Sequence, residues 1–125
     1  MFNDNSTLRQ HTIDYLKGEG ANPKLAEAIE NHADYTAKLI ECDLDKLIRV
    51  TGPEENMTFR EDPQIWEKRI NYFVDLLKQG IELPPLIVTN FWHENHINDG
   101  THRFAALKKL GYKKYWTIVF TKNKI

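Results

Sequence analysis

A strand-turn-helix pattern in the last third of the chain constrains the fold most. Residues 86–91 form an apolar, β-branched run that predicts a buried strand, and residues 96–98 predict a short return strand. Gly100 then precedes a helical pattern over residues 101–110, and Gly111 is placed for its C-terminal cap. This order of elements predicts an α/β (α+β) domain, a small mixed sheet with packed helices.

A second helix is predicted in the middle of the chain. Asp62 can cap its start, Pro63 suits its first position, and Gly80 ends it. Its buried face is expected to hold Trp66, Ile70, Phe73 and Leu77. Upstream, residues 44–50 predict a strand and residues 51–62 a polar loop.

The N-terminal part predicts two further helices. Residues 7–17 have helical spacing, and Asn22-Pro23 marks the next start. That second helix is expected to carry an apolar stripe four residues apart, formed by Leu25, Ile29, Ala33, Ala37 and Ile40. The stripe needs a surface, either the rest of the domain or a second copy in a homodimer. We therefore expect an N-terminal helical arm at 1–41 and a domain at 42–125.

Composition excludes several classes of protein. At 125 residues one domain is expected, and no apolar run approaches the roughly 20 residues that span a bilayer. The first residues lack the basic start and apolar stretch of a signal peptide, and the lone Cys42 permits no internal disulfide. We expect a cytoplasmic protein that does not enter membranes.

The C-terminal part is basic. From Arg103 onward every charged side chain is positive, and the lysines stand among Tyr112, Tyr115 and Trp116. Such a mixture could bind nucleic acid through Lys108, Lys109, Lys113 and Lys114. The alternative is a solvated lysine face on a helix and an edge strand.

The turn from Asp99 to Arg103 is the predicted ligand site. The first amide groups of a helix lack internal partners and carry a partial positive charge, so they suit a phosphate. Gly100 allows close approach, Thr101 can donate its hydroxyl, and His102 and Arg103 supply further donors. We expect the side chains of His102 and Arg103 to converge on one anion.

The stretch Asp-Gly-Thr-His-Arg-Phe-Ala-Ala-Leu-Lys-Lys-Leu-Gly resembles the signature of the ParB/sulfiredoxin superfamily. The likeness begins at Asp43, continues through the helix after Asp62 and the strand after Pro84-Pro85, and ends at residues 116–119. Residues 1–40 fall outside it. The resemblance implies a ParB/sulfiredoxin-like fold in which the Gly-x-His-Arg turn binds a nucleotide.

Departures from the family's patterns separate its activities. Sulfiredoxins have a cysteine where this chain has Thr101, so the resemblance does not extend to sulfinic acid reduction. Their nucleotide-contacting lysine corresponds to Ile65, and Lys68 one turn later is the expected substitute. Partition-type ParB proteins have Glu-Arg where this chain has Thr101-His102, and continue into a DNA-binding domain.

The motif is most similar to that of the free serine kinases. Their base is a glutamate after the first strand, where this chain has Glu54 and Glu55, and Asp99 is the natural second carboxylate. This resemblance implies ATP, ADP or CTP with Mg²⁺ and transfer of phosphate to a small hydroxyl compound. The alternatives are solvated charges for the glutamates and a turn-stabilising or capping role for Asp99.

Three classes of function stay open at this stage. One is a nucleotide-dependent phosphotransferase, the second a non-catalytic module that binds DNA or a regulatory nucleotide, and the third a regulator that dimerises through the arm. A metal site at His93, His96 and His102 is not expected, because these residues do not face one point.

Overall fold

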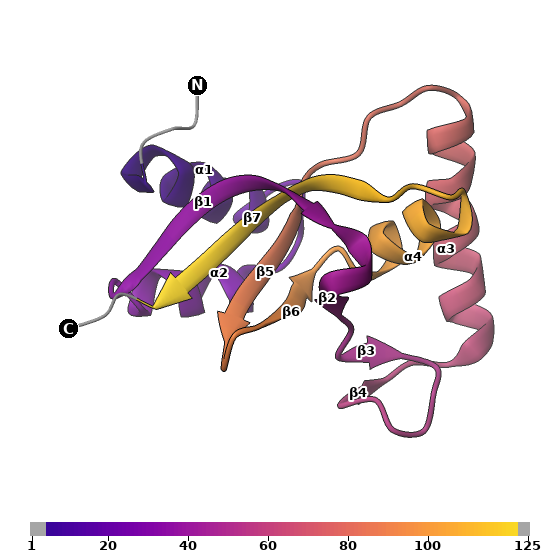
Figure 1. Ribbon diagram of the computed structural model, residues 1–125, viewed down its shortest axis with the longest axis horizontal. Helices are drawn as coiled ribbons and strands as arrows, with labels where there is room; N and C mark the ends of the chain where they lie inside the picture. The colour runs from indigo at the N-terminus through magenta and orange to yellow at the C-terminus, as the bar shows by residue number, and fades with distance from the viewer. Residues whose placement is uncertain (1–4, 123–125) are drawn as a thin grey trace.

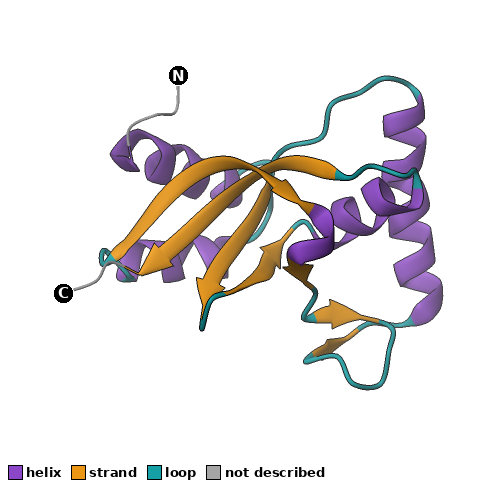
Figure 2. Cartoon of the chain, viewed as in Figure 1, coloured by secondary structure: helices purple, strands orange, loops and turns teal. Residues whose placement is uncertain are grey.

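The computed structural model describes residues 5–122, which form a five-stranded mixed sheet with helices on both faces (Figures 1 and 2). The fold is α+β, as the order of sequence patterns predicted. The N-terminal and central elements are α1 (Asn5–Lys17), α2 (Pro23–Asn31), β1 (Tyr35–Asp43), a 3₁₀ turn η1 (Leu44–Lys46), β2 (Leu47–Ile48), β3 (Thr51–Gly52) and β4 (Phe59–Arg60). The remaining elements are α3 (Pro63–Lys78), β5 (Leu86–Phe91), β6 (Glu94–Asp99), α4 (Thr101–Lys109) and β7 (Lys114–Lys122).

The strand order of the main sheet is β1-β7-β5-β6-β2. β1 pairs antiparallel with β7, β7 parallel with β5, β5 antiparallel with β6, and β6 parallel with β2. β5 therefore lies at the centre, and its first three residues, Leu86, Ile87 and Val88, are apolar and buried because both faces are covered there. β3 and β4 form a separate two-stranded ribbon beside the start of α3 (Figure 1).

Successive residues of the central strands face opposite sides of the sheet and contribute to two cores. On one side Leu86 and Val88 pack with Phe104 and Leu107 of α4 and with the C-terminal half of α3. On the other side Ile87 packs with residues of α1 and α2. The sheet thus separates the arm from the α3–α4 pair.

The N-terminal helices pack on the sheet of their own chain. Leu8 and Leu16 of α1 are fully buried there, together with Ala26 and Ile29 of α2. The Arg9 guanidinium donates to the carbonyl oxygens of Ile29 (2.8 Å), His32 and Tyr35 (both 3.2 Å), which are the last acceptors of α2 and the start of β1. Of the two surfaces expected for the arm, the rest of the domain is the one observed.

One helix prediction is wrong. The stripe was expected to continue on a helix through Ala33, Ala37 and Ile40, but α2 ends at Asn31 and residues 35–43 form β1. Only Ala37 and Ile40 of the stripe lie in β1, and they are three residues apart. A helix would place them on one face, whereas the strand places them on opposite faces, with Ala37 buried and Ile40 exposed. Pairing with β7 along all nine residues of β1 decides between them.

The prediction for residues 44–50 is also only partly right. The strand there is limited to Leu47–Ile48, preceded by a 3₁₀ turn, and the predicted loop 51–62 contains the short β3 and β4. The helices α1, α3 and α4 and the strands β5, β6 and β7 lie where the sequence predicted them, within a few residues at each end. The capping prediction for Asp62 is confirmed, since its carboxylate accepts from the amides of Gln64 and Ile65.

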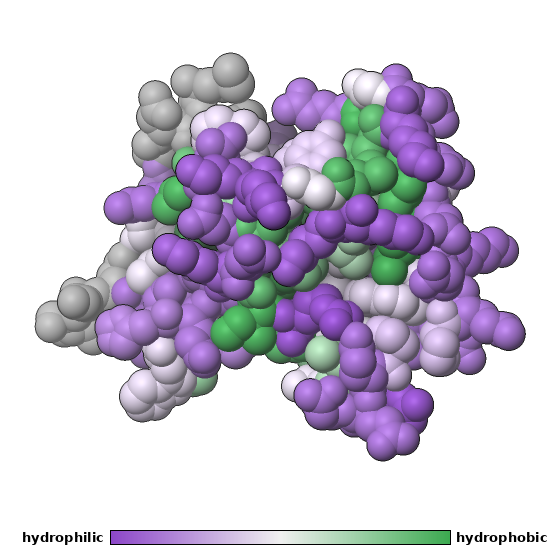
Figure 3. All heavy atoms as spheres, turned by 45° about the vertical axis from the view of Figure 1, so that its right-hand side comes forward, coloured by the Kyte–Doolittle hydropathy of each residue, from purple (hydrophilic) through white to green (hydrophobic). Residues whose placement is uncertain are grey.

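The surface on the side of α3 and α4 is mostly polar, with apolar residues visible in separate stretches between charged ones (Figure 3). Within residues 5–122, no helix combines the length and the apolar character needed to cross a bilayer.

Candidate functional site

The predicted ligand site lies where β6 passes into α4. Gly100 has a φ of +95°, a left-handed conformation that favours glycine, and its carbonyl oxygen accepts the first helical hydrogen bond from the Phe104 amide (2.8 Å). Gly100 has no side chain with which to cap the first turn of α4. The amide groups at this helix start therefore depend on another acceptor, as an anion-binding turn requires.

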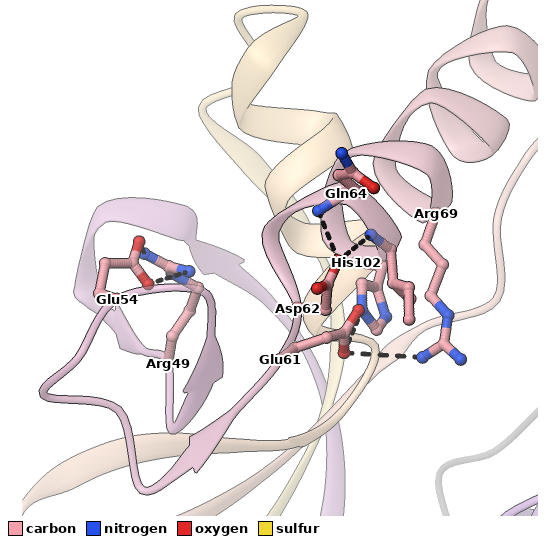
Figure 4. A network of polar contacts seen from close by, with 8 residues as sticks. Arg49, Glu54, Glu61, Asp62, Gln64, Arg69 and His102 are labelled. Carbon is pink, nitrogen blue, oxygen red and sulfur yellow. Dashed lines mark hydrogen bonds and ion pairs between the residues drawn. The ribbon is translucent and has the colours of Figure 1, made fainter.

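His102 points from α4 toward α3. Its Nε2 atom lies 2.9 Å and 3.1 Å from the two carboxylate oxygens of Glu61, the residue before the capping Asp62 (Figure 4). The Trp66 ring lies against the imidazole with centroids 5.1 Å apart, and the Arg49 guanidinium is 5.1 Å from the Trp66 ring centroid. His102 is therefore held in one orientation by contacts on α3 and just before it.

Arg103 points away from this cluster, which corrects the expected convergence of its side chain with His102. Its side chain is only 8% exposed, and Nη2 donates to the Pro85 carbonyl oxygen (2.9 Å) and to Asp99 Oδ2 (3.4 Å). Nη1 donates to the Tyr15 hydroxyl (3.4 Å), and Nε is buried without a partner among the described residues. Consecutive residues of an α-helix point about 100° apart, so neighbours rarely reach one ligand.

A surface depression of about 590 Å³ lies beside His102. It is lined by His102 of α4 and by five residues on one face of α3, namely Ile65, Lys68, Arg69, Tyr72 and Phe73. Of the residues predicted for the ligand site, the structure thus brings Lys68 and His102 together near the Gly100 turn. Thr101 is buried at the helix start.

The three predicted catalytic carboxylates do not gather at this depression. Glu54 forms a two-point ion pair with Arg49 (2.6 and 3.3 Å), apart from the Glu61–His102 contact in Figure 4. A hydrogen bond from Arg49 lowers the pKa of Glu54. Asp99 is bound by Arg103 and by Asn22, whereas Glu55 is exposed in the same loop as Glu54.

Sequence reasoning missed Glu61, Arg69 and Arg49. The Glu61 side chain is 15% exposed and also lies 3.6 Å from Arg69 Nη1. Because residues 51–62 were predicted to form a polar loop, Glu61 was not singled out as a site residue. One signal was available, since Arg69 follows Lys68 and shares the helix face defined by Ile65 and Tyr72.

The C-terminal lysines are interleaved with acids. Lys108 pairs with Asp45 (3.0 Å), Lys109 with Glu67 (3.5 Å), and Lys114 with Asp43 (4.0 Å). Neutralisation by neighbours reduces the attraction of this face for a phosphate backbone. Within the described part of the chain, no cluster of three or more histidine, cysteine or acidic residues has the arrangement of a metal site.

The chain is similar to several solved structures. One is a conserved hypothetical protein from Pyrococcus furiosus, with a TM-score of 0.51 and 24% identity over 66% of this chain and 32% of that one. Another is a free serine kinase in complex with AMP, with a TM-score of 0.50 and 23% identity over 65% of this chain and 30% of that one. A third is sulfiredoxin from Arabidopsis thaliana, with a TM-score of 0.48 and 21% identity over 70% and 86% of the two chains.

These likenesses concern the fold. The chain spans less than a third of the length of the first two structures. No protein-family model and no curated protein matches its sequence. The chain shares the fold of the free serine kinase, whose motif its Asp-Gly-Thr-His-Arg stretch resembles.

Proposed function

We propose that the chain binds a nucleotide, ATP, ADP or CTP with Mg²⁺, with its phosphates at the start of α4 and the rest of the ligand along α3. The observation that carries this proposal is the depression beside His102, in the first turn of α4, where Lys68, Arg69 and His102 line one surface. In the proposed complex, Lys68, Arg69 and the amide groups at the start of α4 bind the same anion.

The strength of such a site follows from its donors. A hydrogen bond to a charged group contributes about 1.5–3 kcal/mol, so three or four of them support micromolar binding after the costs of association. Arg103 does not act on the phosphates in this arrangement, because its guanidinium is bound beneath the turn. It supports the Gly100 backbone instead.

The apolar part of the depression favours a nucleoside over bare phosphate. Ile65 and Tyr72 are large, exposed apolar residues on α3, and Phe73 lies edge-on to Tyr72. A nucleobase can stack on such an aromatic surface whatever its pattern of hydrogen-bonding groups. The free serine kinase to which this chain is similar has structures with AMP and with ADP, which supports an adenine nucleotide.

Magnesium fits only as a companion of the phosphates. Of the nearby carboxylates, Glu61 is bound by His102 and Arg69, and Asp99 by Arg103 and Asn22. Such a site supplies few open ligands, so phosphate oxygens and water would hold most of the ion. When bound, the ion would neutralise phosphate charge.

Calorimetry of the folded chain with ADP and Mg²⁺ tests the proposal, with Lys68→Ala as the variant. Lys68 lines the depression, so its loss is expected to weaken ADP binding roughly tenfold. Lys78→Ala is the matched control, since Lys78 lies on the last turn of the same helix and outside the depression. ADP affinity equal in the two variants, or no binding of any of the three nucleotides, would falsify the proposal.

Phosphoryl transfer to a small hydroxyl compound is the enzymatic form of this proposal. It needs a carboxylate within hydrogen-bond reach to take the hydroxyl proton. Glu54 and Asp99 are both engaged by arginines. Glu55 has no cation pair among the described residues and is the candidate base, but it does not line the depression, so the enzymatic form has less support than nucleotide binding. A phosphotransfer assay with pooled small alcohols tests it, and turnover should fall in Glu55→Gln with ADP binding unchanged.

Nucleic-acid binding through Lys108, Lys109, Lys113 and Lys114 is the other class expected from the sequence. The ion pairs of three of these lysines with acids give it less support than the depression gives nucleotide binding. Retention on DNA that falls with salt and disappears when these lysines become glutamates would favour it over the nucleotide proposal.

A further inference from the structure

Asn22 connects the N-terminal arm to the turn of the ligand site. Its side-chain oxygen accepts from the Leu25 amide (3.3 Å) and caps α2, while its Nδ2 atom donates to Asp99 Oδ1 (3.2 Å). One side chain therefore fixes the start of α2 and the end of β6 together. These two segments are 77 residues apart in the chain.

The bond from Asn22 continues into a network under Gly100. The second oxygen of Asp99 accepts from Arg103, and Arg103 is held by the Pro85 carbonyl oxygen and the Tyr15 hydroxyl of α1. The guanidinium lies directly against Gly100, because a Cβ atom built there would be 2.8 Å from Arg103 Nη2. Two residues of the arm, Tyr15 and Asn22, thus hold the pair that supports the Gly100 backbone.

We propose that Asn22 is a positioning residue of the nucleotide site, acting through Asp99 on the direction of the first amide groups of α4. The inference rests on the proposed function. Gly100 has a φ of +95°, and Asp99 just before it and Arg103 in the first turn after it are both held by this network. If Asp99 turns, Gly100 turns with it, and the amides of α4 lose their common direction toward a phosphate.

The chemistry of helix capping separates this role from a purely structural one. Serine and aspartate cap helices about as well as asparagine, so Asn22→Ser and Asn22→Asp retain the start of α2. In Asn22→Ser, the side chain at position 22 is too short to cap α2 and to reach Asp99 at the same time. Asn22→Asp presents a carboxylate to Asp99 and repels it.

A second asparagine of the arm supplies the control. Asn5 Oδ1 accepts from the Ala37 amide (2.6 Å), so Asn5→Ser also breaks a bond between the arm and the sheet. This bond lies on β1, the edge strand of the sheet, and not at the Gly100 turn. The two serine variants therefore differ in where the lost hydrogen bond lies. Asn22→Ser loses a bond at the Gly100 turn, and Asn5→Ser loses one at β1.

The experiment measures ADP–Mg²⁺ affinity by calorimetry and the amide resonances of Gly100, Thr101 and His102 by NMR, at a temperature where all variants are folded. Asn22→Ser is expected to weaken ADP binding roughly fivefold to tenfold and Asn22→Asp further, whereas Asn5→Ser stays within about twofold. The three turn resonances should shift in both Asn22 variants and not in Asn5→Ser.

The other possible results would contradict either the positioning role or the proposed function. Wild-type affinity in both Asn22 variants, or an equal loss in Asn5→Ser, overturns the positioning role. If the unaltered chain does not bind ADP, the proposed function fails. The resonances then decide the positioning role alone, and unshifted turn amides in Asn22→Ser would overturn it.

Discussion

The side chains around the Gly100 turn divide into two groups with separate supports. His102 is held by Glu61 and Trp66, whereas Arg103 is held by Pro85, Asp99 and Tyr15. Because the two residues are neighbours on α4, they leave the helix in different directions. His102 lines the surface depression, whereas Arg103 lies buried against the backbone of Gly100.

Gly100→Ala tests the support beneath the turn. The new Cβ would meet Arg103 Nη2 at 2.8 Å, and the φ of +95° is strained for alanine. We expect a loss of about 2–4 kcal/mol in the free energy of unfolding, measured with urea.

Gly111→Ala is the control for this measurement. Gly111 has a φ of +86° but nothing within 4 Å of its Cβ position. Gly111→Ala should therefore lower the free energy of unfolding only by the backbone strain, about 1–2 kcal/mol. Equal losses in the two variants would mean that the arginine under Gly100 moves aside at no cost.

At the scale of elements, the β5–β6 hairpin has an unusual turn. Its two central residues, Trp92 and His93, have φ values of +54° and +63°, although hairpin turns of this type favour Asn-Gly. Trp92 is also 78% exposed, and its ring lies edge-on to that of Phe91. Neither tryptophan nor histidine favours this left-handed conformation, and the sequence patterns did not predict the two positive φ values.

Replacing the turn by Trp92→Asn with His93→Gly should stabilise the protein. Removing two unfavourable left-handed residues is expected to raise the free energy of unfolding by about 1–2 kcal/mol, less a small loss of contact with Phe91. Urea denaturation measures the change, and Trp92→Ala, which keeps the strain, should show no gain. An unchanged or lowered midpoint in the double variant would contradict this account of the hairpin.

At the scale of the whole molecule, the sheet joins two hydrophobic cores that contain partly buried tyrosine hydroxyls. Tyr115 donates to the Leu83 carbonyl oxygen (2.6 Å) on the α3–α4 side, and Tyr15 lies on the arm. Burial raises the pKa of both tyrosines above 10.0. Their contribution to stability is therefore complete below pH 10 and is lost as the pH rises through the folded-state pKa values.

We expect the free energy of unfolding to fall above about pH 10, with a weaker fall in Tyr115→Phe. In the folded state Tyr115 keeps its proton while the unfolded chain releases it, so each further pH unit favours unfolding. The phenylalanine variant loses the bond to Leu83 and should be less stable at neutral pH. The difference between the two proteins should narrow as the pH rises from 9 to 11, and a constant difference would count against this assignment.

The division into an arm at 1–41 and a domain at 42–125 stays a prediction. Residues 35–41 belong to β1, and α1 and α2 cover one core of the sheet. These contacts make the arm part of the packing of the whole chain.

Local signals in the sequence were sufficient for several elements. The cap Asp62 with Pro63, the glycines at 100 and 111, and the apolar run of β5 act within a few residues, so α3, α4 and β5 could be predicted without tertiary contacts. The Gly100 turn before α4 is likewise local, whereas Lys68 was expected only from the family resemblance.

Only the tertiary structure decided the rest, because those features depend on residues distant in the chain. Pairing with β7 makes residues 35–43 a strand although their spacing also suits a helix. The contact of Glu61 with His102 spans 41 residues, and the bond of Asn22 to Asp99 spans 77. The direction of a side chain at a helix start follows from which partner the fold brings beside it, and no local pattern contains that partner.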